Sequence, residues 1–267
     1  MWHTKGVFPY FLSVFAATFV QMGCFTLMQK ILACDYAGDR FYWACGLLQA
    51  LFVFPYIALL LPASFFSNKF QKNRVMLWSS AAMTAVMAGI AVLYSLGFFN
   101  AAFWGVILLS SAFAVHSPAK YGILKEMFGT RNLSYSNAYL LIVSVAALFA
   151  SSWIMIACFS AVRGIATGPS ALFWVLAGVS ALAAVSAAFI PAVGREDARI
   201  RMRSVKHTVR ATWANPVSRA CIAGLAVLWG VAQVFVMVFQ DTSASPVLSV
   251  LQNSLALAFA GLIVGGI

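Results

Sequence analysis

The residues best suited to bind an anion lie in one short polar segment, His-Ser-Pro-Ala-Lys-Tyr-Gly-Ile-Leu at 116–124. The Lys120 ammonium can pair with a phosphate or a carboxylate, and His116 adds an imidazole. Because the segment follows a long apolar stretch, we expect it at the cytoplasmic end of a helix. Pro118 would bend the chain there, Lys120 would reach toward lipid phosphates, and Gly122 would allow close packing. The pattern indicates either anion binding or simple anchoring at a membrane surface.

Motifs for catalysis are missing from the sequence. None of the three histidines is followed five residues later by an aspartate, the spacing with which a carboxylate orients a general base in some acyltransferases. The five cysteines show no Cys-x-x-Cys spacing, and there is no glycine-rich phosphate loop or serine elbow. We therefore expect that the chain is not an enzyme and holds no metal or cofactor.

The composition excludes a water-soluble globular protein. Hydrophobic residues make up 63% of the 267 residues, charged residues make up 9%, and the mean hydropathy is +0.92. Apolar stretches of roughly 20 residues, enough to cross a bilayer, recur along the chain. We expect eight spans, at residues 8–28, 42–62, 75–97, 101–115, 138–159, 171–193, 220–239 and 247–267.

The positive charge is distributed as in a membrane protein. A net charge of +11 would suggest a nucleic-acid partner in a soluble chain. With the N-terminus in the cytoplasm, however, every Lys and Arg except Lys30, Arg40 and Arg163 falls on the cytoplasmic side of the expected spans. This asymmetry predicts a cytoplasmic N-terminus, the lipid bilayer as the partner, and no nucleic acid.

A basic interval separates the expected spans into two groups. We expect a six-helix bundle at residues 1–193, a basic cytoplasmic linker at 194–217, and the first two helices of a second bundle at 218–267. Apolar residues alternate with the cations of the linker. Two interpretations stay open, an amphipathic helix on an anionic membrane face and a plain positive-inside loop.

The polar segment resembles the signature after the fourth helix of bacterial lysophospholipid transporters, a family of the major facilitator superfamily. The family also includes the transporter-like portions of multidomain acyltransferase and acyl-carrier-protein synthetase proteins. Farther along, Ser-Asn-Ala at 136–138 resembles the triplet with which the family enters its fifth helix, although a polar helix start explains it equally. The signature residues are Ser117, Pro118, Ala119, Lys120, Tyr121, Gly122 and Asn137.

The segment 64–75 resembles the superfamily loop Gly-x-x-x-Asp-(basic)-x-x-x-Gly-(basic), which acts as a conformational latch. Asn68 stands where that pattern has its Asp, so the resemblance implies a weakened gate. Plain anchoring at the membrane surface is the alternative for the cations. The candidate gating residues are Asn68, Lys69, Lys72 and Arg74.

The resemblance implies an all-α polytopic membrane protein with the major facilitator fold, with a complete six-helix N-terminal half and an incomplete C-terminal half. It also implies alternating access in the bacterial inner membrane, with lysophospholipid moved from the outer to the inner leaflet. An acyltransferase or acyl-carrier-protein synthetase, as a fused domain or a separate protein, is the implied partner. Candidate substrate contacts are Gln21, His116, Lys120 and Gln233.

Two features keep other interpretations open. The expected spans contain no Asp or Glu, which argues against proton or sodium coupling within them. Eight spans are too few for two six-helix halves, so we expect either a fragment of a longer protein or a degraded gene. The alternatives are a major facilitator-type transporter of another small solute or drug, and a non-transporting remnant or membrane scaffold.

Overall fold

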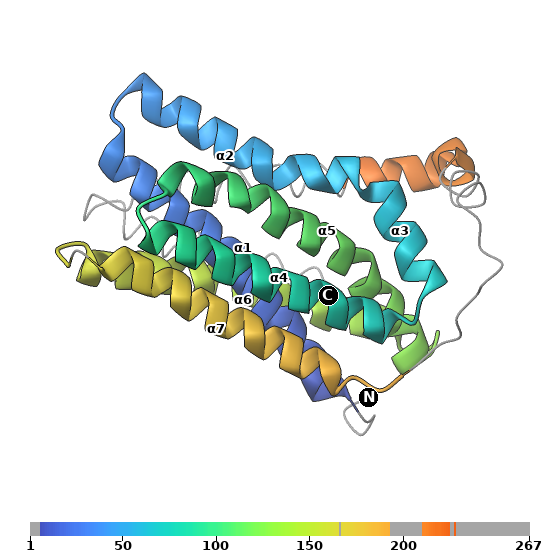
Figure 1. Ribbon diagram of the computed structural model, residues 1–267. Coiled ribbons are helices and arrows are strands. Elements are labelled where there is room, and N and C mark those ends of the chain that lie inside the picture. Colours follow the sequence, from blue (N-terminus) through green and yellow to red (C-terminus); the bar gives the residue numbers. More distant parts are fainter. Residues whose placement is uncertain (1–5, 166, 193–209, 225–226, 228–267) are drawn as a thin grey trace. The chain divides into compact units, whose positions relative to one another are not determined.

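The computed structural model describes residues 6–165, 167–192, 210–224 and 227 (Figure 1). The chain divides into two units, Met1–Met202 and Arg203–Ile267, and each is treated separately. In the described part of the first unit, every regular element is a helix. The helices are α1 (Val7–Asp35), α2 (Asp39–Ala58), α3 (Leu60–Lys69), α4 (Lys72–Ser95), α5 (Phe99–Phe128), α6 (Leu133–Val162) and α7 (Gly168–Ala188).

Six of these helices, all but the ten-residue α3, are long and apolar enough to cross a membrane. They confirm that six spanning helices lie in the first 193 residues, although not all of the expected bounds, and they show a multi-pass, all-helical membrane protein in the described region. The seventh expected span, 220–239, lies outside the described residues except for 220–224 and 227, and the eighth, 247–267, lies entirely outside them.

The second expected span is interrupted. Helix α2 ends at Ala58, and α3 begins at Leu60 and turns away from the α2 axis (Figure 1). Pro62 lacks the N–H that a continuous helix would donate to the Ala58 carbonyl. In α3 it occupies the first turn, where that N–H has no intrahelical acceptor and its loss costs nothing. The prediction of one helix over 42–62 was therefore wrong.

The fourth expected span, 101–115, was too short, because α5 continues unbroken to Phe128. Pro118 removes a single hydrogen bond, the one to the Ala114 carbonyl, and α5 contacts α4 on both sides of this point, at His116 and at Gly122. Helix α5 ends at Phe128 and is followed by Gly129, whose φ of +72° suits glycine. The segment 116–124 thus lies inside a helix, and the expectation of a helix exit at His116 was wrong.

The N-terminus of the fifth span also differs from the prediction. Helix α6 begins at Leu133 rather than at Ala138. Ser136 lies within its first turns, where its hydroxyl donates to the Asn132 carbonyl at 2.8 Å. The helix therefore includes the Ser-Asn-Ala triplet.

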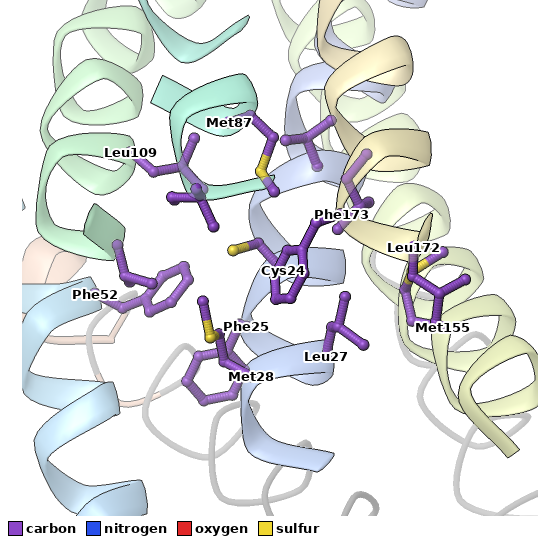
Figure 2. Close-up of a cluster of buried hydrophobic side chains, with 14 of the residues drawn as sticks. Cys24, Phe25, Leu27, Met28, Phe52, Met87, Leu109, Met155, Leu172 and Phe173 are labelled. Atoms are coloured by element: carbon purple, nitrogen blue, oxygen red, sulfur yellow. The ribbon is translucent and has the colours of Figure 1, made fainter. Parts of the chain in front are cut away.

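Helix α1 is the most buried of the spans and forms the centre of the first unit. It packs mainly on α6 and α7, while α4 packs on α5 and α7, and both α2 and α3 pack on α5. Figure 2 shows the core around α1, in which Phe25 meets Phe52 of α2 edge to face with ring centroids 4.9 Å apart. Large apolar side chains such as Trp104 and Trp153 point outward, as expected where lipid replaces water.

Short polar side chains join the helices. The Ser13 hydroxyl of α1 donates to the Ala183 carbonyl of α7 at 3.0 Å, and Thr26 of α1 lies 3.3 Å from the Ser152 hydroxyl of α6. Such bonds hold helices together in lipid, where apolar surfaces gain nothing by leaving the solvent.

In the second unit, residues 210–214 and 216–224 are helical on either side of a bend at Asn215. The Asn215 side-chain oxygen accepts hydrogen bonds from the Val217 and Ser218 amides at 2.9 and 3.4 Å. Asn215 is therefore an N-cap, and Pro216 follows it at the favoured first position. Most of the expected linker, residues 194–209, lies outside the described residues.

Candidate functional site

Three residues with side chains that could bind a substrate or line its site lie on one face of helix α5. Phe113, His116 and Lys120 follow each other at spacings of three and four, so their side chains lie along a single helix face. All three are buried, with exposed fractions of 0% for His116 and 6% for Lys120. A basic residue and an imidazole are thus held together inside the bundle.

Lys120 is a buried cation surrounded by aromatic rings. Its Nζ lies 5.4 Å from the Phe113 ring centroid and 5.3 Å from that of Tyr121. No acidic side chain among the described residues forms an ion pair with it. Because Lys120 lies eight residues before Phe128, it sits about 12 Å inside the end of the helix. The burial of Lys120 does not fit the alternative of simple anchoring at a membrane surface.

Cation–π contacts offset only part of the cost of burying an ammonium group in a dry interior. Charged residues inside membrane helices are rare for this reason, and they usually mark a functional site. Lys120 is therefore a candidate anion-binding residue.

His116 is anchored to the neighbouring helix. Its Nδ1 lies 3.0 Å from the hydroxyl of Ser79 in α4, and Nε2 is buried without a hydrogen-bond partner among the described residues. The imidazole also lies against the Phe113 ring, with centroids 5.8 Å apart. His116 is therefore an interior residue that presents one unused nitrogen.

Gln21 joins the same group of side chains through Tyr56. The Gln21 amide donates a 2.7 Å hydrogen bond to the Tyr56 hydroxyl, linking α1 to α2. The Tyr56 ring lies 6.2 Å from the Phe113 ring. Phe113 thus forms the hub of a group contributed by four helices. We call this group the Phe113 cluster, and its members are Gln21, Tyr56, Ser79, Phe113, His116 and Lys120.

A second polar group joins the start of α4 to the end of α5. Lys72, the first residue of α4, forms a salt bridge with Glu126 in the last turn of α5. Gly122 packs beside it, since a Cβ there would lie 2.8 Å from Lys72 Cε. Asn73 donates a 3.5 Å hydrogen bond to the Ile190 carbonyl after α7. The helices extend beyond the expected spans, so carboxylates lie near their ends: Asp35 in α1, Asp39 in α2 and Glu126 in α5.

The other candidate gating residues lie on the surface. Asn68, Lys69 and Arg74 are exposed near the α3–α4 connection. The Lys69 ammonium lies over the Phe65 and Phe70 rings, 5.4 and 5.7 Å from their centroids.

The remaining signature and substrate candidates are spread more widely. On α5, Ala119 is fully buried, Ser117 and Pro118 are partly buried, and Tyr121 is exposed. Asn137 is exposed on α6, and Gln233 lies outside the described residues. The structure thus brings together three of the four predicted substrate contacts.

Three members of the Phe113 cluster were missed from the sequence. Phe113 stands three residues before His116, so helical spacing would have identified it if the helix had been predicted to run through Pro118. Tyr56 and Ser79 lie on other helices at no fixed spacing from the polar segment. No sequence signal points to them.

The chain is similar to lysophospholipid transporters. Over 202 residues it is 31% identical to the lysophospholipid transporter LplT of Yersinia enterocolitica, an alignment covering 70% of this chain and 45% of that protein. Proteins of the same name from Yersinia pestis and Yersinia pseudotuberculosis are 29% identical over 202 residues, with the same coverage. No protein-family model matches the chain.

These relatives are named as transporters rather than enzymes. The chain spans less than half the length of the curated relatives it matches, since the aligned part is 45% of each.

Proposed function

We propose that this chain is part of a transporter that moves lysophospholipid from the outer to the inner leaflet of a bacterial inner membrane. It would work by alternating access in the major facilitator fold, with its N-terminus in the cytoplasm. The observation that carries the proposal is Lys120, a buried cation with no carboxylate partner in the described part of the chain, in a protein similar to lysophospholipid transporters.

The substrate's chemistry matches the surroundings of Lys120. A lysophospholipid has an anionic phosphate, which an ammonium binds through charge-assisted hydrogen bonds. It also has one acyl chain, for which the apolar side chains around Phe113 provide a suitable environment. In this proposal the phosphate lies at Lys120 and the chain runs along the apolar helix faces. The Lys72–Glu126 pair and the α3–α4 connection would act at the gate.

An acylating enzyme would consume the product. A lysophospholipid delivered to the inner leaflet is a substrate for reacylation, so an acyltransferase or acyl-carrier-protein synthetase, fused or separate, is the proposed partner.

The test is uptake of lysophosphatidylethanolamine with a radiolabelled acyl chain into membrane vesicles containing the protein. Lys120→Ala should lower uptake about tenfold or more, because it removes a charge-assisted contact, and Lys120→Arg should keep more of it. Lys125→Ala is the matched control, since Lys125 lies on the same helix but is exposed. Its uptake should equal that of the wild type.

Three results would contradict parts of the proposal. Absence of wild-type uptake would reject lysophospholipid transport. Full uptake by Lys120→Ala would reject Lys120 as the phosphate contact. Competition by small solutes or drugs, but not by unlabelled lysophospholipid, would favour a transporter of another cargo.

A further inference from the structure

We propose that His116 determines specificity by accepting a hydrogen bond from the free glycerol hydroxyl of a lysophospholipid. The inference rests on the proposed function and adds to it the means by which a one-chain lipid is told from a two-chain lipid. These two lipids can share their phosphate, headgroup and first acyl chain. They differ in that a hydroxyl in one is an acyl ester in the other.

The contacts of Ser79 assign the tautomer of His116. The Ser79 hydroxyl oxygen lies 2.7 Å from the Val75 carbonyl and 3.0 Å from the Met76 carbonyl. Carbonyl oxygens only accept, so the single hydroxyl hydrogen is donated to them. The Ser79 oxygen is then free to accept from His116 Nδ1, 3.0 Å away. We therefore assign the proton of the neutral ring to Nδ1, which leaves Nε2 as an acceptor.

That acceptor is not used within the described part of the protein. His116 is fully buried, and Nε2 has no hydrogen-bond partner there. A buried acceptor without a donor is unfavourable, and most such groups find a partner. The chemistry required of a partner is specific: a hydroxyl donates, whereas a phosphate or ester oxygen only accepts.

The position of His116 suits a glycerol hydroxyl. His116 and Lys120 lie four residues apart on one face of α5, a spacing that places their Cβ atoms about 5–6 Å apart. Both pack against the Phe113 ring, where its centroid is 5.8 Å from the imidazole centroid and 5.4 Å from the Lys120 ammonium. In lysophospholipid the hydroxyl and the phosphate are attached to neighbouring glycerol carbons. A lipid whose phosphate lies at Lys120 therefore has its hydroxyl near His116, and an ester in its place would leave Nε2 unsatisfied.

The experiment compares uptake of lysophosphatidylethanolamine with that of its 2-deoxy analogue, which has the same acyl chain and headgroup. Because the ammonium group is present in both lipids, the difference reports the hydroxyl alone. The wild type should take up the hydroxyl-bearing lipid about tenfold better. His116→Asn keeps an N–H near the position of Nδ1 and lacks Nε2, so its ratio should fall to about one. Leu108→Ala, on an outward face of the same helix, is the control and should keep the wild-type ratio.

The outcomes separate this inference from the proposed function. If the wild type takes up neither lipid, the proposed function fails. If it takes up both lipids equally, lysophospholipid transport stands and the role of His116 is rejected. An unchanged tenfold preference in a correctly folded His116→Asn variant would also reject that role. The wild-type comparison needs no variant to fold, so it decides by itself whether the hydroxyl is recognised.

Discussion

The hydroxyl of Tyr10 donates a 2.7 Å hydrogen bond to the backbone carbonyl of Lys120, 110 residues farther along the chain. Tyr10 lies in the first turn of α1 and is fully buried. The bond fixes the central helix against the part of α5 that presents the buried cation. Tyr10 is therefore a positioning residue for Lys120.

Tyr10→Phe should weaken this connection while keeping the ring packing. Loss of one buried hydrogen bond should lower the free energy of unfolding by about 1 kcal/mol, because the ring remains and only the polar contact is lost. A thermal unfolding scan in detergent should show a midpoint lower by about 2–4 °C. Tyr135→Phe, at an exposed position of α6, should leave the midpoint unchanged. Equal midpoints for the two variants would show that the bond contributes nothing.

The Lys72–Glu126 pair should behave as a charge pair that tolerates reversal. Lys72→Glu and Glu126→Lys should each destabilise the protein through like-charge repulsion, and the double reversal should recover most of the loss. Because both side chains are partly exposed, at 18% and 23%, the coupling free energy should be only about 1 kcal/mol.

The control for this pair uses the neighbouring cation. Lys125→Glu combined with Glu126→Lys should show no recovery, because Lys125 is exposed and is not the partner of Glu126 in the salt bridge. Thermal unfolding of the single and double variants in one detergent supplies the free energies. Coupling no larger than in the Lys125 control would mean that the pair does not hold the helix ends together.

Gly23 should tolerate no side chain. An added Cβ would lie 2.8 Å from Leu176 Cδ2 and 3.4 Å from Met155 Cγ, and both of these side chains are buried in the core. Gly23→Ala should therefore lower the free energy of unfolding by about 1–3 kcal/mol, despite the better helix propensity of alanine. The measurement is again the thermal midpoint in detergent.

Gly178→Ala is the matched control, because Gly178 lies inside α7 with no atom within 4 Å of an added Cβ. It should be neutral or slightly stabilising. A similar effect of both changes would show that the α1–α6–α7 contact at Gly23 can relax.

Removing one partner of the Gln21–Tyr56 hydrogen bond should destabilise the protein more than removing the second partner after the first is already gone. Tyr56→Phe leaves the buried Gln21 amide without its acceptor and should lower the free energy of unfolding by about 1–3 kcal/mol. In the Gln21→Leu background, where no donor is left, Tyr56→Phe should cost less. A double-mutant cycle on thermal unfolding measures the difference. Strictly additive effects would contradict a direct bond between α1 and α2.

The first six spans were predictable from hydropathy because lipid leaves the backbone few choices. A segment of roughly 20 apolar residues must satisfy its own hydrogen bonds, so it forms a helix whatever its neighbours are. The helix ends were less predictable. Pro62 interrupts the second span and Pro118 leaves the fourth intact, although the two residues share the same backbone chemistry.

The candidate site was only partly predictable for a related reason. Lys120 and His116 stand out in the sequence because polar residues are rare in so apolar a chain. Whether such residues face the membrane surface or the bundle interior depends on where the helix ends and on what packs against it. The alternative in which Lys120 only anchors the chain at the membrane surface depended on a helix end near His116, whereas α5 continues two turns beyond Lys120.

By itself, the sequence determined that this protein is helical, lies in the membrane and carries its unusual polar residues between 116 and 124, because composition and hydropathy act locally along the chain. Only the tertiary structure decided that Gln21, Tyr56 and Ser79 gather with Lys120 around Phe113, and that Lys72 pairs with Glu126. These contacts join residues on different helices. Their formation depends on helix packing, where small side chains and a few hydrogen bonds decide which helices become neighbours. No local sequence pattern specifies this choice.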